Sequence, residues 1–468
     1  RPTRWAPPSW SGRTSADVTA AERLAAFVER ALFRDLSPEA LAQLKLRVLD
    51  ALGCAIGATD AGPMRAVREH TEELGGAPLA TLIGGGRTAP DRAAFANGAL
   101  VRYLDFNDSY FAPGETCHPS DNLAPVLAAA ELAGATGREL LVALAVAYQV
   151  QCRLSDEAPV RDRGFDHTVQ GAYAAAAAVA KALRLDAGEI ANAVAIAGTS
   201  LNALRVTRTG ALSHWKGLAY PAAAFGAVHA ALLARRGITG PRAVFEGAKG
   251  FEDTIVGPFE IDWEREDLER VRETFLKRFN AEIHSQSALE AALELREEHA
   301  LDPAQVERVE AEVFQVAFDI IGGGAEGAKT DVRTKEEADH SLPYLLAVAL
   351  LDGQVLPAQY APERIAAADV QALIRRVGVR PAADLSARFP AEHACRLRIV
   401  LRDGRELTAE KADYLGFRTR PMGWDDALAK FELLAGGRAP AGLAEAVERL
   451  EEVEAAELCA LLERVRAA

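Results

Sequence analysis

Acid–base groups gather in the segment 104–121, which holds Asp105, Asp108 and His118. A carboxylate can orient an imidazole, and an unperturbed histidine pKa near ~6.5 suits proton transfer at neutral pH. The same residues could instead serve the backbone, with Ser120 capping the helix that follows and Asp108 closing a turn. Spacing alone leaves both interpretations open.

Cationic side chains are concentrated between residues 205 and 217, where Arg205, Arg208, His214 and Lys216 occur in an otherwise acidic chain. Arginine can grip a carboxylate with two hydrogen bonds, and lysine can bind it as a point charge. We expect an anion-binding segment here. The alternative is a solvated loop, which the composition of the segment by itself favours.

A second cationic group lies just before a helix expected from residue 287. Lys277, Arg278 and His284 are close in sequence, and the helix N-terminus could assist in binding an anion. Ser285 could also cap that helix, and the two interpretations are compatible.

A fourth segment, residues 338–344, contains a histidine followed by Ser341, a leucine, a proline and Tyr344. A lone histidine before Ser-x-Pro belongs more often to a helix N-cap than to a catalytic site. Tyr344 could nevertheless donate a proton to a leaving hydroxyl group.

The charge and cysteine content exclude several classes of function. A formal charge of −14 argues against a nucleic-acid partner or an anionic membrane surface, whereas a local cationic cluster still permits a small anionic substrate. The five cysteines are scattered, so we expect neither disulfides nor an iron–sulfur cluster. We expect no metal and no cofactor. With no apolar stretch of spanning length and no signal peptide recognised, the sequence predicts a cytoplasmic protein.

The elements that position these groups are mainly helical. Helix caps at Thr19-x-x-Glu22, Ser37-Pro38 and Asp186-x-x-Glu189 predict successive helices up to about residue 236. Alternating apolar residues over 309–317 predict a strand, and residues 397–408 predict a hairpin with a type I′ turn at Asp403-Gly404.

This pattern divides the chain into two units. We expect a flexible lead-in over 1–16, a large all-helical domain built from 17–270 and 412–468, and a smaller inserted α+β lid domain over 271–411. The predicted fold class is therefore mainly α, with the helical domain formed by both ends of the chain.

Four ordered segments resemble the MmgE/PrpD family, whose members include 2-methylcitrate dehydratase-like lyases. They are Leu104–Ser109 with His118–Asp121, Ser213–Gly217, Phe279–Gln286 and Asp339–Tyr344. The resemblance implies a helical domain with a smaller lid, a homodimer and no required metal. It also implies a pocket formed by Asp105, Ser109, His118, His167, Lys216, Lys277 and Tyr344. The segment 111–117 looks like an insertion before His118.

We therefore expect a metal-independent lyase that dehydrates a small polycarboxylate of the 2-methylcitrate or citrate type by general acid–base catalysis. His118, oriented by Asp105, would transfer one proton, and Tyr344 or His167 the other. Lys216 and Lys277 would bind carboxylates from opposite sides of a cleft and contribute little to stability, while Ser109, Arg208, Arg278 and His284 would complete the substrate contacts. The alternatives are a cis-aconitate-type decarboxylase, a dicarboxylate epimerase, or a non-catalytic dimer that binds a metabolite.

Overall fold

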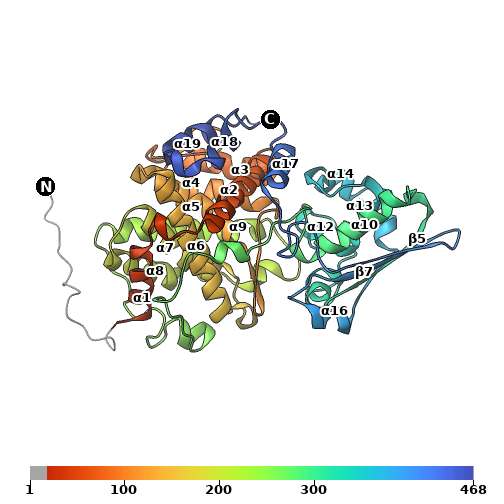
Figure 1. Cartoon of the computed structure of the whole chain (residues 1–468), viewed down its shortest axis with the longest axis horizontal. Coiled ribbons are helices and arrows are strands. Elements are labelled where there is room, and N and C mark those ends of the chain that lie inside the picture. Colours follow the sequence, from red (N-terminus) through yellow and green to blue (C-terminus); the bar gives the residue numbers. More distant parts are fainter. Residues whose placement is uncertain (1–17, 467–468) are drawn as a thin grey trace.

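The computed structural model describes residues 18–466, so the lead-in predicted for residues 1–16 lies outside the described part of the chain. Helices dominate this part, which confirms the mainly α fold class (Figure 1), and its two largest hydrophobic cores are separate. The larger core takes residues from Ala21–Leu276 and again from Met422–Val465, whereas the smaller core takes residues from Phe279–Leu407. Both ends of the described chain therefore build the larger helical unit.

The larger unit is a helical assembly whose elements follow the local signals in the sequence. The capping boxes at Thr19 and Asp186 are both formed, and the Ser37 hydroxyl accepts the Ala40 N–H. Its α-helices are α1 (Ala20–Arg30), α2 (Pro38–Ala58), α3 (Gly62–Leu74), α4 (Pro90–Tyr103), α5 (Leu123–Ala133), α6 (Gly137–Glu157), α7 (Thr168–Ala182), α8 (Ala187–Ser200), α9 (Trp215–Ala234), α17 (Trp424–Ala435), α18 (Leu443–Glu448) and α19 (Ala455–Glu463).

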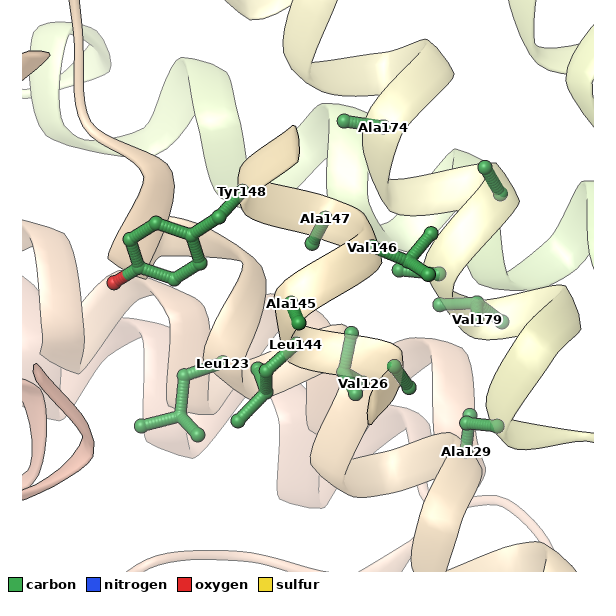
Figure 2. Close-up of a cluster of buried hydrophobic side chains, with 14 of the residues drawn as sticks. Leu123, Val126, Ala129, Leu144, Ala145, Val146, Ala147, Tyr148, Ala174 and Val179 are labelled. Atoms are coloured by element: carbon green, nitrogen blue, oxygen red, sulfur yellow. The ribbon is translucent and has the colours of Figure 1, made fainter. Parts of the chain in front are cut away.

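The centre of the larger unit is packed with small side chains. Figure 2 shows α5, α6 and α7 in close contact through alanine, valine and leucine side chains. The alanine-rich stretch 172–182 lies within α7, which packs against α6, α8 and α9. A Cβ at Gly171 would lie 2.3 Å from the Tyr220 ring, so only glycine allows α9 to approach this closely. The alanine run is therefore a close-packing surface.

Helix α9 corrects one expectation from the sequence. It has 20 residues and a mean hydropathy of 1.4, so by length and composition alone it could cross a membrane. It packs against α4 and α7 of the helical unit, and its first turn carries the buried Lys216. A core helix in an alanine-rich bundle meets the same apolar criterion as a membrane span.

The smaller unit is built on a four-stranded sheet of order β6-β5-β7-β8. β5 (Val306–Val313) pairs in parallel with β6 (Val377–Pro381) and antiparallel with β7 (Cys395–Leu401), which pairs with β8 (Glu406–Lys411). Helix α10 packs on β7 and β8, and α13 packs on α10 and α15. Its principal α-helices are α10 (Gln286–Glu298), α12 (Lys335–Ala338), α13 (Leu342–Asp352), α14 (Pro362–Ile365), α15 (Ala368–Ile374) and α16 (Ala383–Arg388).

Two details of the predicted strands were wrong. The strand expected over 309–317 ends at Val313, because Gln315–Ala317 turns into the short helix α11. The β7–β8 connection is also longer than a two-residue type I′ turn. Leu401 N–H bonds the Arg405 carbonyl, and of the loop residues only Gly404 has a positive φ, of 87°. This is a three-residue loop with glycine in the left-handed position.

The contact between α6 and the C-terminal segment provides a test of the larger unit. Gly137 donates its N–H to the Val453 carbonyl at 2.7 Å, and a Cβ there would lie 1.6 Å from the Leu450 carbonyl oxygen. We predict that Gly137→Ala lowers the free energy of unfolding by about 1–3 kcal/mol, because two backbone segments must separate. Urea unfolding followed by circular dichroism measures this. Gly62→Ala, at an open position in α3, is the matched control, and equal midpoints for the two variants would contradict the packing.

Candidate active site

A buried carboxylate at the end of α4 forms the centre of the candidate site. Asp105 follows the C-terminus of α4 with a left-handed φ of 55°, which turns its side chain back into the protein. Its Oδ1 accepts hydrogen bonds from Arg102 Nη1 at 2.7 Å and Lys277 Nζ at 2.6 Å, and its Oδ2 accepts one from Lys216 Nζ at 3.0 Å. All four residues are buried. One carboxylate thus holds three cations drawn from distant parts of the chain.

This arrangement keeps Asp105 ionised. Burial raises the pKa of a carboxyl group, but the positive charges of Arg102, Lys277 and Lys216 outweigh it and hold the pKa of Asp105 well below its usual range. For Lys277, burial lowers the pKa against the raising effect of Asp105. Because each buried charge needs its partner, the cluster is a structural unit as well as a part of the pocket.

The imidazole of His118 is held in one orientation by backbone. Its Nδ1 lies 2.7 Å from the Asp108 carbonyl oxygen and 3.1 Å from Ser109 Oγ. A carbonyl oxygen only accepts, so Nδ1 carries the hydrogen and Nε2 carries the free electron pair. Nε2 makes no hydrogen bond to the described residues. The sequence suggested that Asp105 orients His118, whereas the Asp108 carbonyl fills that role.

Asp108 is itself fixed by its neighbours. Its Oδ1 accepts from Ser120 N at 3.0 Å and from Ser120 Oγ, and its Oδ2 accepts from the Tyr148 hydroxyl at 2.8 Å. The Tyr148 ring projects from α6 with its hydroxyl directed away from the packed alanines (Figure 2). The turn that carries the His118 acceptor is therefore anchored to a core helix.

His118 is a neutral base in this setting. Burial lowers its pKa well below the usual histidine value, and the nearby charges of Arg102 and Lys277 lower it further. His167 lies beside it, with ring centroids 5.3 Å apart, and burial lowers the pKa of His167 to about 3. Both ring nitrogens of His167 are buried and have no hydrogen-bond partner among residues 18–466. Such unpaired polar atoms are available for a bound molecule.

These groups line a cavity that is rich in charge. Arg208 pairs with the buried Asp166 at 2.5 Å, and Arg161 and Arg205 share Glu326 at 2.9 and 2.7 Å. Five cationic residues contribute to the wall, namely Arg102, Arg161, Arg205, Arg208 and Lys277, together with Glu115, Glu282, Glu326 and three histidines, His118, His167 and His340. A small polyanion would find several hydrogen-bond donors in one pocket.

Lys216 lies on the far side of Asp105, outside this cavity. Its ammonium group contacts Asp105 Oδ2 at 3.0 Å, Asp339 Oδ1 at 2.8 Å and His340 Nδ1 at 3.0 Å. These same three residues have their ligand atoms within 4.8 Å of one another, a spacing that could hold a metal ion. The lysine nitrogen takes the position at which a cation would meet all three. The grouping is therefore satisfied by an ammonium charge.

The structure brings most of the predicted site residues together. Asp105, His118, His167, Arg208 and Lys277 line the cavity. Ser109 and Lys216 do not line the cavity themselves but contact residues that do. Ser109 Oγ lies beside the His118 imidazole, and Lys216 donates a hydrogen bond to Asp105.

Three other predicted residues lie elsewhere. Tyr344 is fully buried in the smaller core and its hydroxyl donates to the Gln359 carbonyl. Arg278 pairs with Glu290 away from the cavity. His284 is enclosed by aromatic rings, 5.2 Å from the Phe111 ring centroid.

Several cavity residues were not recognised from the sequence. Arg102 precedes Asp105 by three positions, so helical spacing could have suggested the pair. Glu282 lies in the family-like segment Phe279–Gln286, which could have suggested it, whereas Arg161 and Glu326 carry no local signal because they meet only through the fold.

The insertion-like segment 111–117 shapes the pocket and joins the two units. It forms a hairpin of β3 (Tyr110–Ala112) and β4 (Glu115–Cys117), whose second strand delivers Glu115 to the cavity. Burial raises the pKa of Glu115 to about 7. The Phe111 ring contacts Phe275, at 4.8 Å between centroids, and Phe389 of the smaller unit at 5.5 Å. The hairpin thus packs against both units beside the site.

Two family models match the chain. The MmgE/PrpD N-terminal domain matches residues 22–264, and the MmgE/PrpD C-terminal domain matches residues 279–456. The second match continues past the smaller core into α17 and α18, which pack in the larger unit.

Similar curated proteins include two named 2-methylcitrate dehydratase. The one from Cupriavidus necator is 30% identical over 406 residues, covering 80% of this chain and 81% of the relative. The one from Escherichia coli strain K12 is 31% identical over 341 residues, covering 67% and 68%. Cis-aconitate decarboxylase from Mus musculus is 26% identical over 451 residues, covering 90% and 88%.

The buried lysines yield a prediction about stability. The sequence suggested that they contribute little to the fold, but Lys277 is fully buried and paired with Asp105 at 2.6 Å. We predict that Lys277→Met lowers the free energy of unfolding by about 3 kcal/mol, because a buried ion pair loses one partner. Thermal or urea unfolding measures the loss. Lys249→Met at an exposed site should change stability by no more than about 0.5 kcal/mol, and a similar value for Lys277→Met would contradict the buried pair.

Proposed function

Because this chain belongs to the MmgE/PrpD family, we propose that its pocket removes water from a tricarboxylate of the 2-methylcitrate or citrate type by general acid–base catalysis. The chain is an enzyme of the 2-methylcitrate dehydratase-like kind, related at about 30% identity to curated dehydratases over most of its length. The substrate and the assignment of residues to steps are our proposal.

One observation carries the proposal: the His118 imidazole is a neutral base with a fixed tautomer at the wall of a cation-rich cavity. Elimination of water needs a base that takes a proton from the carbon next to a carboxylate. With Nδ1–H bonded to the Asp108 carbonyl, Nε2 is the atom that accepts this proton. An anionic substrate beside the ring would raise its pKa in the complex and strengthen the base.

The reaction also requires positive groups that stabilise the charge on the substrate carboxylate, and the arginines and Lys277 supply them. Charge accumulates on the substrate carboxylate as the proton leaves, and donors fixed in an enclosed site stabilise that charge. Arg205 and Arg208 each retain donor groups beyond those used by Glu326 and Asp166. We propose that they bind substrate carboxylates with Lys277, while Lys216 holds Asp105 in place from behind.

We further propose that the smaller unit acts as a lid and that the enzyme is a cytoplasmic homodimer without a cofactor. The support for a lid is that residues from both units line one cavity: His118 and His167 come from the helical unit, and Glu282 and His340 from the smaller one. Closure of two units over a substrate would exclude water from the reaction.

Decarboxylation of cis-aconitate is the second candidate, because the relative of that name aligns over 90% of this chain. Both reactions would use carboxylate binding and proton transfer in the same pocket. A substrate panel separates them.

We predict that 2-methylcitrate or citrate, rather than cis-aconitate, is turned over, and that prior dialysis against EDTA leaves the rate unchanged because Lys216 occupies the one candidate ion position found in the described chain. Formation of the unsaturated product is followed by ultraviolet absorbance, and release of carbon dioxide reports decarboxylation. No turnover of the hydroxy acids would refute the dehydratase proposal. A loss restored by added metal would refute metal independence.

A second prediction concerns His118. His118→Asn should lower kcat by ~10²–10⁴, because the amide N–H can still reach the Asp108 carbonyl while the base is lost. In the wild type, kcat/KM should fall on the acid side only below the usual histidine pKa of ~6.5, because burial and the adjacent cations lower the folded-state pKa and keep the base neutral. Steady-state rates from pH 4.5 to 9 test both. His299→Asn, at an exposed position, is the control, and near-normal activity of His118→Asn would exclude it as the base.

A further inference from the structure

Two carboxyl groups in the cavity wall, Glu115 and Glu282, have no lysine or arginine partner among the described residues. Glu282 lines the cavity from the smaller unit, where its backbone N–H bonds the Asp339 carbonyl at 3.0 Å. Its Oε2 accepts the His284 N–H at 2.7 Å, and Oε1 makes no hydrogen bond within the described chain. Asp105 and Glu326, by contrast, are each paired with lysine or arginine. Glu282 is therefore a buried carboxyl group with one oxygen unused.

A purely structural role accounts for only one of the two carboxyl oxygens of Glu282. Glu282 caps the short 3-10 turn Ile283–Ser285 through Oε2. The cap needs one acceptor oxygen, which a glutamine would also provide. A buried, unpaired carboxylate would carry a large desolvation cost, so the group is better accommodated as a neutral acid. In agreement, burial raises the pKa of Glu282 to about 8, despite the nearby charge of Lys277.

The other residues considered as proton donors for the site are poorly suited to protonate a leaving group. The Tyr344 hydroxyl is bonded to the Gln359 carbonyl inside the smaller core and does not line the cavity. Burial lowers the pKa of His167 to about 3 and of His340 to about 4, so both imidazoles are neutral at pH 7. A general acid must hold its proton before the reaction, which neutral imidazoles with such low pKa values do poorly.

We propose that Glu282 is the general acid of this pocket and delivers the proton that the leaving hydroxyl group needs. The inference rests on the proposed dehydration and deepens it, since it assigns the second proton transfer to a residue on the smaller unit. The base comes from the helical unit and the acid from the smaller unit, so elimination requires both to enclose the substrate.

The proposed elimination balances in both protons and electrons. His118 Nε2 takes the proton from the substrate carbon, the electron pair of that C–H bond forms the double bond, and the C–O bond breaks. The Glu282 carboxyl O–H gives its proton to the departing hydroxyl, which leaves as water. His118 ends protonated and Glu282 ends as a carboxylate. Loss of the first proton to solvent and uptake of one by Glu282 restore the enzyme.

Substitution by glutamine is the sharpest test, because it keeps the cap and the volume and removes the transferable proton. Glu282→Gln should lower kcat for 2-methylcitrate dehydration by ~10²–10⁴ while KM changes less than about threefold. Wild-type kcat/KM should fall as pH rises through about 8, where Glu282 loses its proton. This basic limb should be absent from the residual activity of the glutamine variant, and Glu282→Asp should recover part of the rate and restore the limb.

Two further variants make the outcome decisive. Glu298→Gln, at an exposed position in α10, should behave as the wild type. Glu115→Gln removes the other cavity carboxyl with a raised pKa. The proposal is overturned if Glu282→Gln keeps kcat within threefold, if only KM rises, or if Glu115→Gln alone abolishes the basic limb. If Glu282→Gln unfolds, the pH profile of Glu282→Asp decides. A wild type that dehydrates no substrate in the panel refutes the proposed function instead.

Discussion

The ion cluster around Asp105 is the constraint on which the rest of the site depends. Arg102 comes from α4, Lys216 from the start of α9, and Lys277 from the segment that leads into the smaller unit, and one buried carboxylate binds all three. Removing three cations from water is costly unless an anion compensates, so these segments cannot separate without exposing unpaired charge. The cluster fixes the chain at the point where the two hydrophobic cores meet.

The two lysines bound to Asp105 have different roles on its two sides. On one side, Lys216 joins Asp105 to Asp339 and so to the smaller unit. On the other side, Lys277 reaches the cavity, where its charge and that of Arg102 add to the effect of burial, which is the main cause of the low pKa of His118. The same charges that hold the fold therefore also contribute to the protonation state of the proposed base. Sequence proximity suggested a direct Asp105–His118 pair, but the link between them is electrostatic, and the hydrogen bond to His118 comes from the Asp108 carbonyl.

How much could be predicted from the sequence depends on how local each signal is. Caps such as Thr19-x-x-Glu22 and the change of pattern near Trp263 identified helices and the smaller α+β unit, because neighbouring residues determine them. The resemblance to a family predicted Lys277 and His167 as site residues, and both line the cavity. Glu326 pairs with both Arg161 and Arg205, which lie more than 100 positions away from it in the chain. No local sequence pattern predicts such a contact. Tyr344 is the opposite case. Its position in the sequence suggested a site residue, but its hydroxyl donates to the Gln359 carbonyl inside the smaller core.

Burial acts on the two kinds of titratable group in opposite directions, and this bears on how one pocket could hold both an acid and a base. Removal from water disfavours the charged form, which lowers the pKa of an imidazole and raises that of a carboxyl group. In this cavity burial leaves His118 neutral and basic, and Glu282 neutral and acidic. Carboxylates that must stay charged, Asp105 and Asp166, are those with cations in direct contact. At this site, Asp105 and Asp166 touch two or more cations and keep their charge, whereas burial raises the pKa of Glu115 and Glu282, which touch no lysine or arginine among the described residues.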